Sequence, residues 1–301
     1  MNKFKIEPKC ERSTKWDSLL EIIRHIKESK EQVKIAIVGK YTGLQDSYLS
    51  VIKALEHAAI NNNRELKISW VESENLNDQD HSDWTEIKQA NGILVPGGFG
   101  VRGVEGKIKA IKYARENKIA FLGICLGMQL AVVEFCRNVV GMEKASHEEF
   151  VDTPGDHVIV FMPDISKTMK GGTMRLGAKH TYIKDPNSLA SRIYYGKDTA
   201  FERHRHRYEV NIEHRKAMED GGLIFSGEDS NQERMEILEL ADHPFFVGTQ
   251  YHPEYTSRPF RPNPVFYAFV QVGKQISVTF IAALGTNDNV GVKSELELKY
   301  S

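Results

Sequence analysis

The distribution of apolar residues predicts alternating strands and helices in the first half of the chain. Short, continuous apolar runs are typical of buried strands; they lie at residues 33–38, 66–71, 92–95 and 119–124. Between and after them, apolar residues recur at every third or fourth position, as expected for helices at residues 47–61, 104–117 and 126–137. Strands that alternate with helices in this way predict a parallel sheet covered by helices.

The second half has a different pattern. Its apolar runs are short and are separated by Gly, Asp and Asn turns; they lie at residues 157–162, 208–212, 223–226, 235–240 and 245–250. We expect these to be added strands, some of them antiparallel. A helix is predicted to start at Pro262-Asn263-Pro264, since proline is favoured in the first helical turn.

Three segments are expected along the chain. Residues 1–32 form a linker segment with an amphipathic helix, because Trp16, Leu19, Ile23 and Ile26 recur at helical spacing up to about Ser29. Residues 33–275 form one compact α/β domain, which has enough apolar residues for a large core. Residues 276–301 form a C-terminal tail whose role the sequence does not indicate.

Charge and cysteine content narrow the class of protein. The formal net charge is −1, from 40 Lys and Arg against 41 Asp and Glu, so no nucleic-acid partner is expected. No apolar run is long enough to span a membrane, and no membrane partner is expected. Three cysteines are too few for a disulfide framework. These features predict a cytoplasmic protein.

Cys125 is the candidate nucleophile. In Gly123-Ile124-Cys125-Leu126-Gly127 it lies between a predicted buried strand and a predicted helix, the setting of a nucleophile elbow. Glycines two positions away on each side would leave the thiol accessible to a substrate, and the helix dipole favours a thiolate. Taken alone, the pattern also fits a core cysteine between packing glycines.

A base and an orienting carboxylate follow a later strand. His252, Pro253 and Glu254 come directly after the apolar run 245–250, and proline would end that strand. Glu254 could accept the proton of one imidazole nitrogen and stabilise the imidazolium form of His252. Cys125, His252 and Glu254 together predict a catalytic triad, whereas an isolated His-Pro-Glu would be a solvated loop.

A glycine-rich loop supplies a candidate oxyanion hole. Residues 96–100, Pro-Gly-Gly-Phe-Gly, end another predicted strand, where small residues leave backbone N–H groups accessible. Donors from Gly98 and from Leu126, the residue after the nucleophile, would stabilise a tetrahedral oxyanion. A simple tight turn is the alternative. Residues 39–43 lack the spacing of a phosphate-binding P-loop.

The densest basic stretch, residues 203–209, permits several interpretations. On a strand, its three arginines would lie on one face and its two histidines, His204 and His206, on the other. It could be a charged edge strand, or a carboxylate-binding arginine could act there. A metal pair from the two histidines lacks a third ligand at suitable spacing, so no metal is expected.

These motifs resemble the class I, triad-type glutamine amidotransferases, and within them the glutaminase domains of the CTP synthase family. The loop 96–98, the elbow 123–127 and the segment 252–254 are general to the superfamily. Segments particular to CTP synthases are residues 99–107, 123–129, 174–177 and 203–211. The resemblance covers about residues 10–275 and implies a flavodoxin-like class I amidotransferase fold, with a mainly parallel central sheet, flanking helices and added antiparallel strands.

The resemblance also implies an activity, the hydrolysis of L-glutamine to glutamate and ammonia through a thioester on Cys125. His252 would be the acid and base, and Glu254 would orient it. By the same resemblance, the glutamine site would be lined by Gly98, Leu126, Gln129, Glu149 and Arg207. Glu149 would bind the substrate ammonium group and Arg207 its α-carboxylate.

Other partners are implied by the family and not by residues of this chain. The ammonia would serve amination of UTP to CTP in a synthase domain, which is absent from this chain and would use ATP, Mg²⁺ and UTP, with GTP as allosteric activator. No cofactor is expected in this chain itself. The alternatives are a γ-glutamyl hydrolase or other triad amidotransferase, and a glutaminase-like module that is inactive alone and serves assembly or regulation.

Overall fold

The computed structural model describes residues 14–29, 31–40, 42–43, 45–150, 155–162 and 174–274. Cys10 and the predicted tail at residues 276–301 lie outside the described residues. All of the predicted catalytic and glutamine-binding residues lie inside them.

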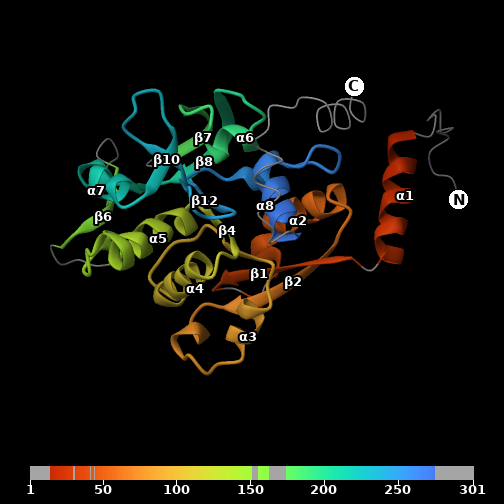
Figure 1. Cartoon of the computed structure of the whole chain (residues 1–301), viewed down its shortest axis with the longest axis horizontal. Helices are drawn as coiled ribbons and strands as arrows, with labels where there is room; N and C mark the ends of the chain where they lie inside the picture. The colour runs from red at the N-terminus through yellow and green to blue at the C-terminus, as the bar shows by residue number, and fades with distance from the viewer. Residues whose placement is uncertain are drawn as a thin grey trace, which may run out of the picture.

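One half of the main sheet is parallel, as the alternating pattern predicts. In this half the strand order is β2-β1-β3-β4-β12, and each neighbouring pair is parallel. The strands are β1 (Gln32–Gly39), β2 (Glu65–Glu72), β3 (Gly92–Val95), β4 (Ala120–Ile124) and β12 (Phe246–Thr249) (Figure 1). All of them begin within about one residue of the apolar runs in the sequence. In β3, β4 and β12 every residue is buried, which leaves little room for polar residues.

The other half of the sheet is antiparallel, which confirms the expectation from the later apolar runs. It continues from β12 through β11 (Met235–Leu240), β10 (Leu223–Glu228) and β7 (Arg175–Ile183) to β8 (Thr199–His206). A second, three-stranded sheet contains β5 (Ser146–His147), β6 (His157–Phe161) and β9 (Tyr208–Val210). The apolar pattern does not predict β7, because most of its side chains are exposed.

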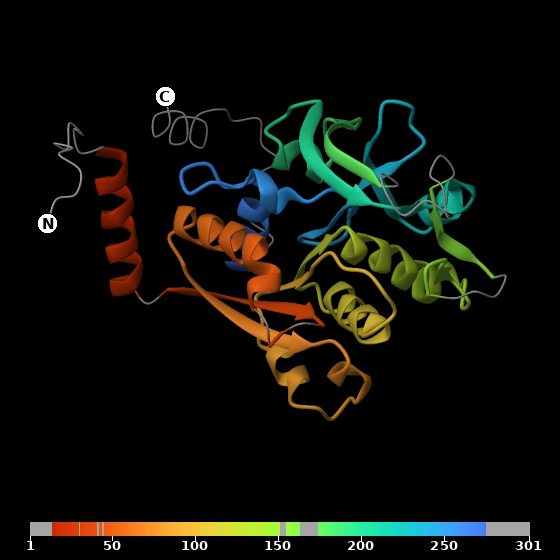
Figure 2. The ribbon, with the colours of Figure 1, turned by 180° about the vertical axis from the view of Figure 1, so that it is seen from behind.

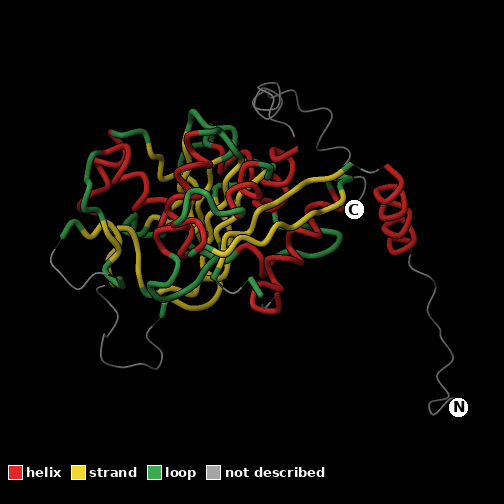
Figure 3. The backbone as a smooth tube through the Cα atoms, turned by 90° about the horizontal axis from the view of Figure 1, so that it is seen from below, coloured by secondary structure: helices red, strands yellow, loops and turns green. Residues whose placement is uncertain are grey.

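Helices cover both faces of the sheet, and β1 shows why. Its side chains alternate between the faces, so Ile35 and Ile37 enter one apolar cluster while Ala36 and Val38 enter the other. The first cluster includes α2 (Leu49–Asn61) and α8 (Pro264–Lys274); the second includes α4 (Val104–Glu116) and α5 (Leu126–Phe135). Figure 3 shows the strands as a central layer between helices.

Several short elements connect these layers. The predicted polar loop 75–82 contains the 3-10 turn η2 (Asn75–Asn77). The helix predicted at residues 126–137 consists of α5 and of a π-helical segment that follows it, η3 (Cys136–Val140). The remaining short elements are η1 (Gln45–Tyr48), α3 (Asp83–Lys88), α6 (Leu189–Ile193), η4 (Ile212–His214), α7 (Arg215–Asp220) and η5 (Pro253–Thr256). The short helices α3, α6 and α7 are too brief to show helical periodicity in the sequence.

The N-terminal helix α1 (Thr14–Ser29) confirms the amphipathic helix expected near residues 16–29. It stands beside the domain, apart from the sheet (Figures 1 and 2). Ile26 is buried, and the ring of Trp16 meets that of Phe260 edge to face at 4.8 Å. No helix in the described part of the chain has the length and apolar character needed to cross a membrane.

We expect Gly106→Ala to destabilise the domain, although alanine favours helices. A Cβ atom on Gly106 would lie 1.6 Å from the carbonyl oxygen of Ser73, so α4 would have to move away from the end of β2. We expect a loss of about 2 kcal/mol in the free energy of unfolding, measured by urea denaturation. Gly43→Ala, whose Cβ would meet nothing within 4 Å, is the control and should lose none. Equal stability of the two variants would contradict this account of the α4 contact.

Candidate active site

The carboxyl ends of β3, β4 and β12 lie next to one another and bring together the three motifs found in the sequence. The three strands are parallel neighbours, with Val95 paired to Gly123 and Thr249 paired to Ile124. The glycine-rich loop follows β3, Cys125 follows β4, and the segment of His252 follows β12. Parallel pairing therefore converts motifs that are up to 156 positions apart, from Pro96 to His252, into one site.

Cys125 has the strained backbone of a nucleophile elbow. Its φ is +53° and its ψ is −102°, values that a non-glycine residue rarely adopts. The conformation is held by its neighbours, because Cys125 N–H donates to the Thr249 carbonyl at 2.7 Å and its carbonyl accepts from Gln129 N–H at 3.1 Å. The thiol lies at the N-terminus of α5, whose dipole favours a negative charge on sulfur.

The two flanking glycines serve close packing of the backbone. A Cβ atom on Gly127 would lie 2.0 Å from the Val95 carbonyl oxygen, and one on Gly123 would lie 2.7 Å from the carbonyl of Gly127. From the sequence, these glycines are expected to give a substrate access to the thiol. The structure shows a different reason for them, which is that the first turn of α5 rests directly on β3 and β4.

His252 and Glu254 form the ion pair that the sequence predicts. The distance from His252 Nδ1 to Glu254 Oε1 is 2.8 Å, and both side chains are buried. Burial by itself lowers the pKa of His252, but the neighbouring Cys125 and the carboxylate of Glu254 outweigh it and hold that pKa well above 6.5. Since Nδ1 is taken by Glu254, Nε2 is the nitrogen available to the thiol.

The strand β8, at the antiparallel edge of the sheet, also contacts the site. A bridge joins Arg203 to His252, whose N–H donates to the Arg203 carbonyl at 2.8 Å. The Cys125 thiol lies 3.8 Å from the carbonyl oxygen of Arg205, within reach of a weak S–H donation. The sequence does not indicate this return of β8, because the two segments are about 50 residues apart and belong to strands at different places in the sheet.

The glycine-rich loop lies against the nucleophile and the base. A Cβ atom on Gly97 would be 2.9 Å from His252 Cε1 and 3.5 Å from Cys125 Cβ, while one on Gly98 would be 3.5 Å from Leu126 Cδ2. Leu126 is the first residue of α5, so its N–H has no acceptor within the helix. The predicted oxyanion donors, Gly98 and Leu126, are therefore neighbours beside the thiol.

Glu149 and Arg207 converge on the same region. One oxygen of the Glu149 carboxylate accepts the Gly100 N–H at 2.9 Å, which ties it to the glycine-rich loop. Burial raises the pKa of Glu149, while Gly100 N–H and the positive charges of Lys40 and Arg207 oppose the rise. Arg207 keeps a buried Nε without a hydrogen-bond acceptor among the described residues. The Glu149 carboxylate and the Arg207 guanidinium thus lie within electrostatic reach of each other.

Gln129 lies in this region but its side chain is bonded to protein groups. Its Nε2 donates to the Tyr208 carbonyl at 2.9 Å and to Gln250 Oε1 at 3.1 Å, and its Oε1 lies 3.0 Å from His147 Nε2. His147, which the sequence analysis does not single out, is buried, and its Nδ1 accepts the N–H of Glu149 at 3.1 Å. Gln129 therefore links the helix of Cys125 to the segments of Glu149, Arg207 and His252.

The basic stretch of β8 alternates as expected. Arg203 and Arg205 are exposed, whereas His204 and His206 are buried. His204 Nε2 is 3.1 Å from Glu236, and His206 Nδ1 is 3.0 Å from the Tyr208 carbonyl. Burial and the neighbouring His204 lower the pKa of His206 well below 6.5, so it is neutral. Among the described residues, no group of three or more His, Cys, Asp or Glu side chains is arranged to hold a metal ion.

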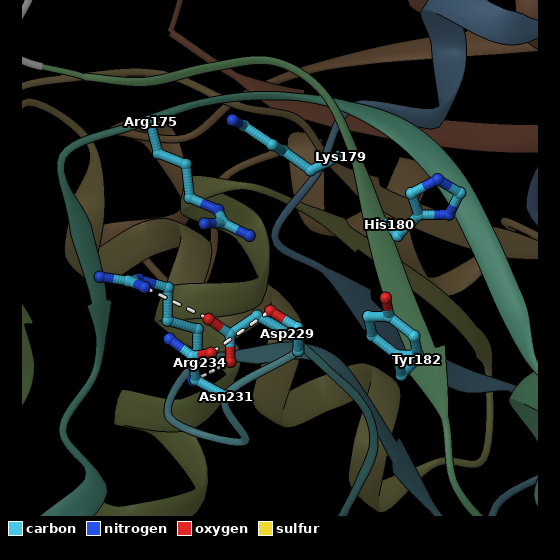
Figure 4. Close-up of a pocket in the computed structure, with 8 residues that line it drawn as sticks. Arg175, Lys179, His180, Tyr182, Asp229, Asn231 and Arg234 are labelled. Carbon is cyan, nitrogen blue, oxygen red and sulfur yellow. Dashed lines mark hydrogen bonds and ion pairs between the residues drawn. The ribbon is translucent and has the colours of Figure 1, made fainter.

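A separate cavity of about 320 Å³ opens beside β7 (Figure 4). Arg175, Lys179, His180 and Tyr182 line it from β7, and the loop after β10 supplies Asp229 and Arg234. Arg234 contacts Asp229 at 3.2 Å, and Arg175 pairs with Glu236 at 2.6 Å. None of the predicted catalytic or glutamine-binding residues lines this cavity.

We expect Glu254→Gln to lower the pKa of His252, because the buried imidazolium loses its nearest negative charge. Fewer Cys125–His252 ion pairs would then form at neutral pH, and alkylation of Cys125 by iodoacetamide should slow about tenfold. Peptide mass spectrometry across pH 6–9 measures the rate. Glu105→Gln, which removes an exposed carboxylate paired with Arg137 at 3.0 Å, is the control. An unchanged rate in Glu254→Gln would exclude this electrostatic role.

Known proteins that are similar to this chain point to one family. The profile described as glutamine amidotransferase class-I matches residues 43–272. CTP synthase 2 of Saccharomyces cerevisiae is 48% identical over 272 residues, which are 85% of this chain and 46% of that protein. Human CTP synthase 1 is 51% identical over 248 residues, covering 80% of this chain and 42% of that protein. The chain therefore spans less than half the length of these curated relatives.

A solved structure shows a similarity to the same group of proteins. The glutaminase domain of Trypanosoma brucei CTPS, with bound acivicin, superposes with a TM-score of 0.75 at 38% identity, and the match covers 80% of this chain and 94% of that one. The α/β architecture and the class I fold expected from the motifs are thus confirmed. The chain belongs to the class I glutamine amidotransferase family, and within that family it is homologous to the glutaminase half of CTP synthases.

Proposed function

We propose that this chain hydrolyses L-glutamine to glutamate and ammonia through a thioester on Cys125. The observation that carries the proposal is the arrangement of a strained cysteine at a helix N-terminus facing the buried His252–Glu254 pair, whose ion-pair distance is 2.8 Å. This is the arrangement that covalent acyl transfer by a thiol requires.

Acylation would begin at the Cys125–His252 ion pair. The thiolate sulfur attacks the side-chain amide carbon of glutamine, and the negative charge moves to the carbonyl oxygen. The N–H groups of Gly98 and Leu126 are the proposed donors to this oxyanion, each of which is worth about 3–4 kcal/mol in other acyl-transfer enzymes. His252 then gives its proton to the leaving nitrogen, and ammonia departs as the thioester forms.

Deacylation would reverse these roles. The neutral His252 takes a proton from water, and the resulting hydroxide attacks the thioester carbon. The tetrahedral intermediate collapses to glutamate and returns the thiolate of Cys125, while Glu254 stabilises the imidazolium form. The raised pKa of His252 before acylation supports its role as the acid that protonates the leaving nitrogen.

Glu149 and Arg207 are proposed to bind the two charged groups of the substrate. The buried Nε of Arg207 lacks an acceptor, so an α-carboxylate would supply one, and the Glu149 carboxylate suits an α-ammonium group. Gln129 has its amide bonded to Tyr208, Gln250 and His147, and we propose that it shapes this pocket through those partners as well as lining it.

The ammonia is proposed to serve amination of UTP to CTP in a synthase domain like that of the CTP synthase relatives. That domain would bind ATP, Mg²⁺ and UTP, with GTP as activator of the glutaminase. We further propose a cytoplasmic location, because the two described cysteines, Cys125 and Cys136, are both free thiols, as is usual in a reducing compartment.

The proposal predicts that the glutamine analogue 6-diazo-5-oxo-norleucine forms one adduct, on Cys125. Intact-mass spectrometry measures the adduct, and Cys125→Ser is the control that should show none. Cys136 is an internal reference, because burial raises the pKa of its thiol to about 12 and protects it. If saturating reagent gives no adduct, the chain does not form a competent glutamine site by itself, and the role in assembly or regulation would replace the enzymatic one.

Arg207→Ala is expected to raise KM for glutamine about 10- to 100-fold with a smaller change in kcat, because a buried charge-assisted contact to the α-carboxylate is lost. Ammonia release measured against glutamine concentration separates the two constants. The matched control is Arg203→Ala, which removes an exposed arginine of the same stretch. Equal KM values in the two variants would place the carboxylate elsewhere.

A further inference from the structure

Glu202 is a buried carboxyl group that the glutaminase mechanism does not use. It lies on β8, next to the bridge between Arg203 and His252, and only 3% of its surface is exposed. Its hydrogen bonds come from neutral donors: Asn263 Nδ2 at 2.7 Å and Tyr194 Oη at 3.2 Å to one oxygen, and Thr256 Oγ1 at 2.8 Å to the other. No Lys or Arg lies within ion-pair distance of it among the described residues.

These donors hold both ends of the segment that carries His252 and Glu254. Thr256 follows Glu254 by two residues in η5 and is bonded directly to Glu202. At the other end, the hydroxyl of Tyr194 also lies 2.9 Å from that of Tyr251, the residue before His252. Asn263 closes the cluster by donating to Thr256 Oγ1 at 2.8 Å. The position of the base and its carboxylate therefore depends on what Glu202 accepts.

The same carboxyl group is electrostatically coupled to the triad. Burial raises the pKa of Glu202 from 4.5 to about 7; the three donors oppose this rise and the negative charge of Glu254 adds to it. The titratable and charged groups that face it are Tyr194, Tyr251 and Glu254, and its register neighbour on β7 is Lys179. Burial, with Glu202 among the added causes, raises the pKa of both tyrosines well above 10, so they stay neutral.

We propose that Glu202 is a positioning residue for His252 and Glu254, and that the charge state of its carboxyl group controls the reactivity of Cys125 through them. The inference rests on the proposed glutaminase function and adds to it a residue that acts through the triad. Ionised Glu202 places a second negative charge behind Glu254. This charge stabilises the imidazolium of His252 and so increases the fraction of Cys125 present as a thiolate in the ion pair.

Glu202→Gln is a suitable variant, because it removes the charge and can keep the hydrogen bonds. The amide oxygen can accept from Asn263 and Tyr194. The amide nitrogen can donate to the Thr256 hydroxyl oxygen, whose own proton can go to the Pro253 carbonyl at 3.1 Å. Glutamine thus imitates the protonated state of Glu202 at every pH.

The experiment compares the rate of Cys125 labelling by 6-diazo-5-oxo-norleucine in the full chain and in Glu202→Gln from pH 5.5 to 8.5. At pH 5.5 the two rates should be equal, since Glu202 is protonated. At pH 8.5 the variant should be about three- to tenfold slower, and the ratio of rates should change with a midpoint near pH 7. Glu239→Gln is the matched control; Glu239 is also buried, but it accepts the N–H groups of Leu189 and Ala190 at the start of α6.

Thermal unfolding gives a readout that is independent of glutamine chemistry. The pKa of Glu202 is higher in the folded chain, so the stability that its proton contributes is complete below about pH 4.5 and is lost as the pH rises through about 7. The Tm of the wild-type chain should therefore fall relative to that of Glu202→Gln, by several degrees between pH 5 and pH 8. The control Glu239→Gln should not reproduce this trend.

The possible results separate this inference from the proposed function. A pH-dependent ratio of labelling rates with a matching Tm trend supports the role of Glu202. Labelling of both proteins with a constant ratio of rates overturns that role and leaves the glutaminase proposal intact. Absence of labelling in the wild-type chain overturns the glutaminase proposal, and the role of Glu202 in it is overturned as well.

Discussion

The contact between the first turn of α5 and the backbone of β3 is the constraint on which the site depends. Because Gly127 has no side chain, its Cα approaches the Val95 carbonyl so closely that an added Cβ would lie 2.0 Å from it. This approach forces the chain to turn sharply after β4, and Cys125 takes up the turn with a positive φ. The strain is supported by hydrogen bonds to β12 and within α5. The same contact thus places the thiol of Cys125 at the N-terminus of α5.

Around this turn, two buried polar clusters fix the remaining groups from opposite sides. Gln129 and His147 connect α5 to the segments of Glu149 and Tyr208, whereas Glu202 and Tyr194 hold the segment of His252 and Glu254. Because these clusters are buried, the loss of any hydrogen bond in them would cost free energy of folding. The side chains of the clusters therefore have few alternative arrangements. Arg207 Nε, which has no acceptor among the described residues, is located where the substrate carboxylate is expected. The two clusters therefore hold the scaffold, and Arg207 keeps a donor that a substrate carboxylate could use.

Electrostatics within the site follow from burial combined with specific partners. Burial opposes charge on His252, yet its contacts with Cys125 and Glu254 reverse the direction of the pKa shift. Among the described residues Glu202 has no such charged partner, and burial shifts it toward its neutral form. Glu236, which faces His204 and Arg175, shifts toward its charged form. Carboxyl groups of similar burial thus acquire different charge states within one sheet, which is how a protein obtains both stable ions and titrating groups near neutral pH.

The sequence by itself determined the parallel core, the elbow at Cys125, the pairing of His252 with Glu254, and the alternation along β8, because each depends on local periodicity or on residues a few positions apart. It did not indicate β7, because that strand is largely exposed, or α3, α6 and α7, because they are too short to show a period. Only the tertiary structure decided that β8 returns to His252, that Gln129 bonds to His147, and that Glu202 lies behind the triad. These contacts join segments far apart in the chain, and a buried polar side chain has no periodic signature in sequence. Its partners are chosen by the packing of the whole sheet.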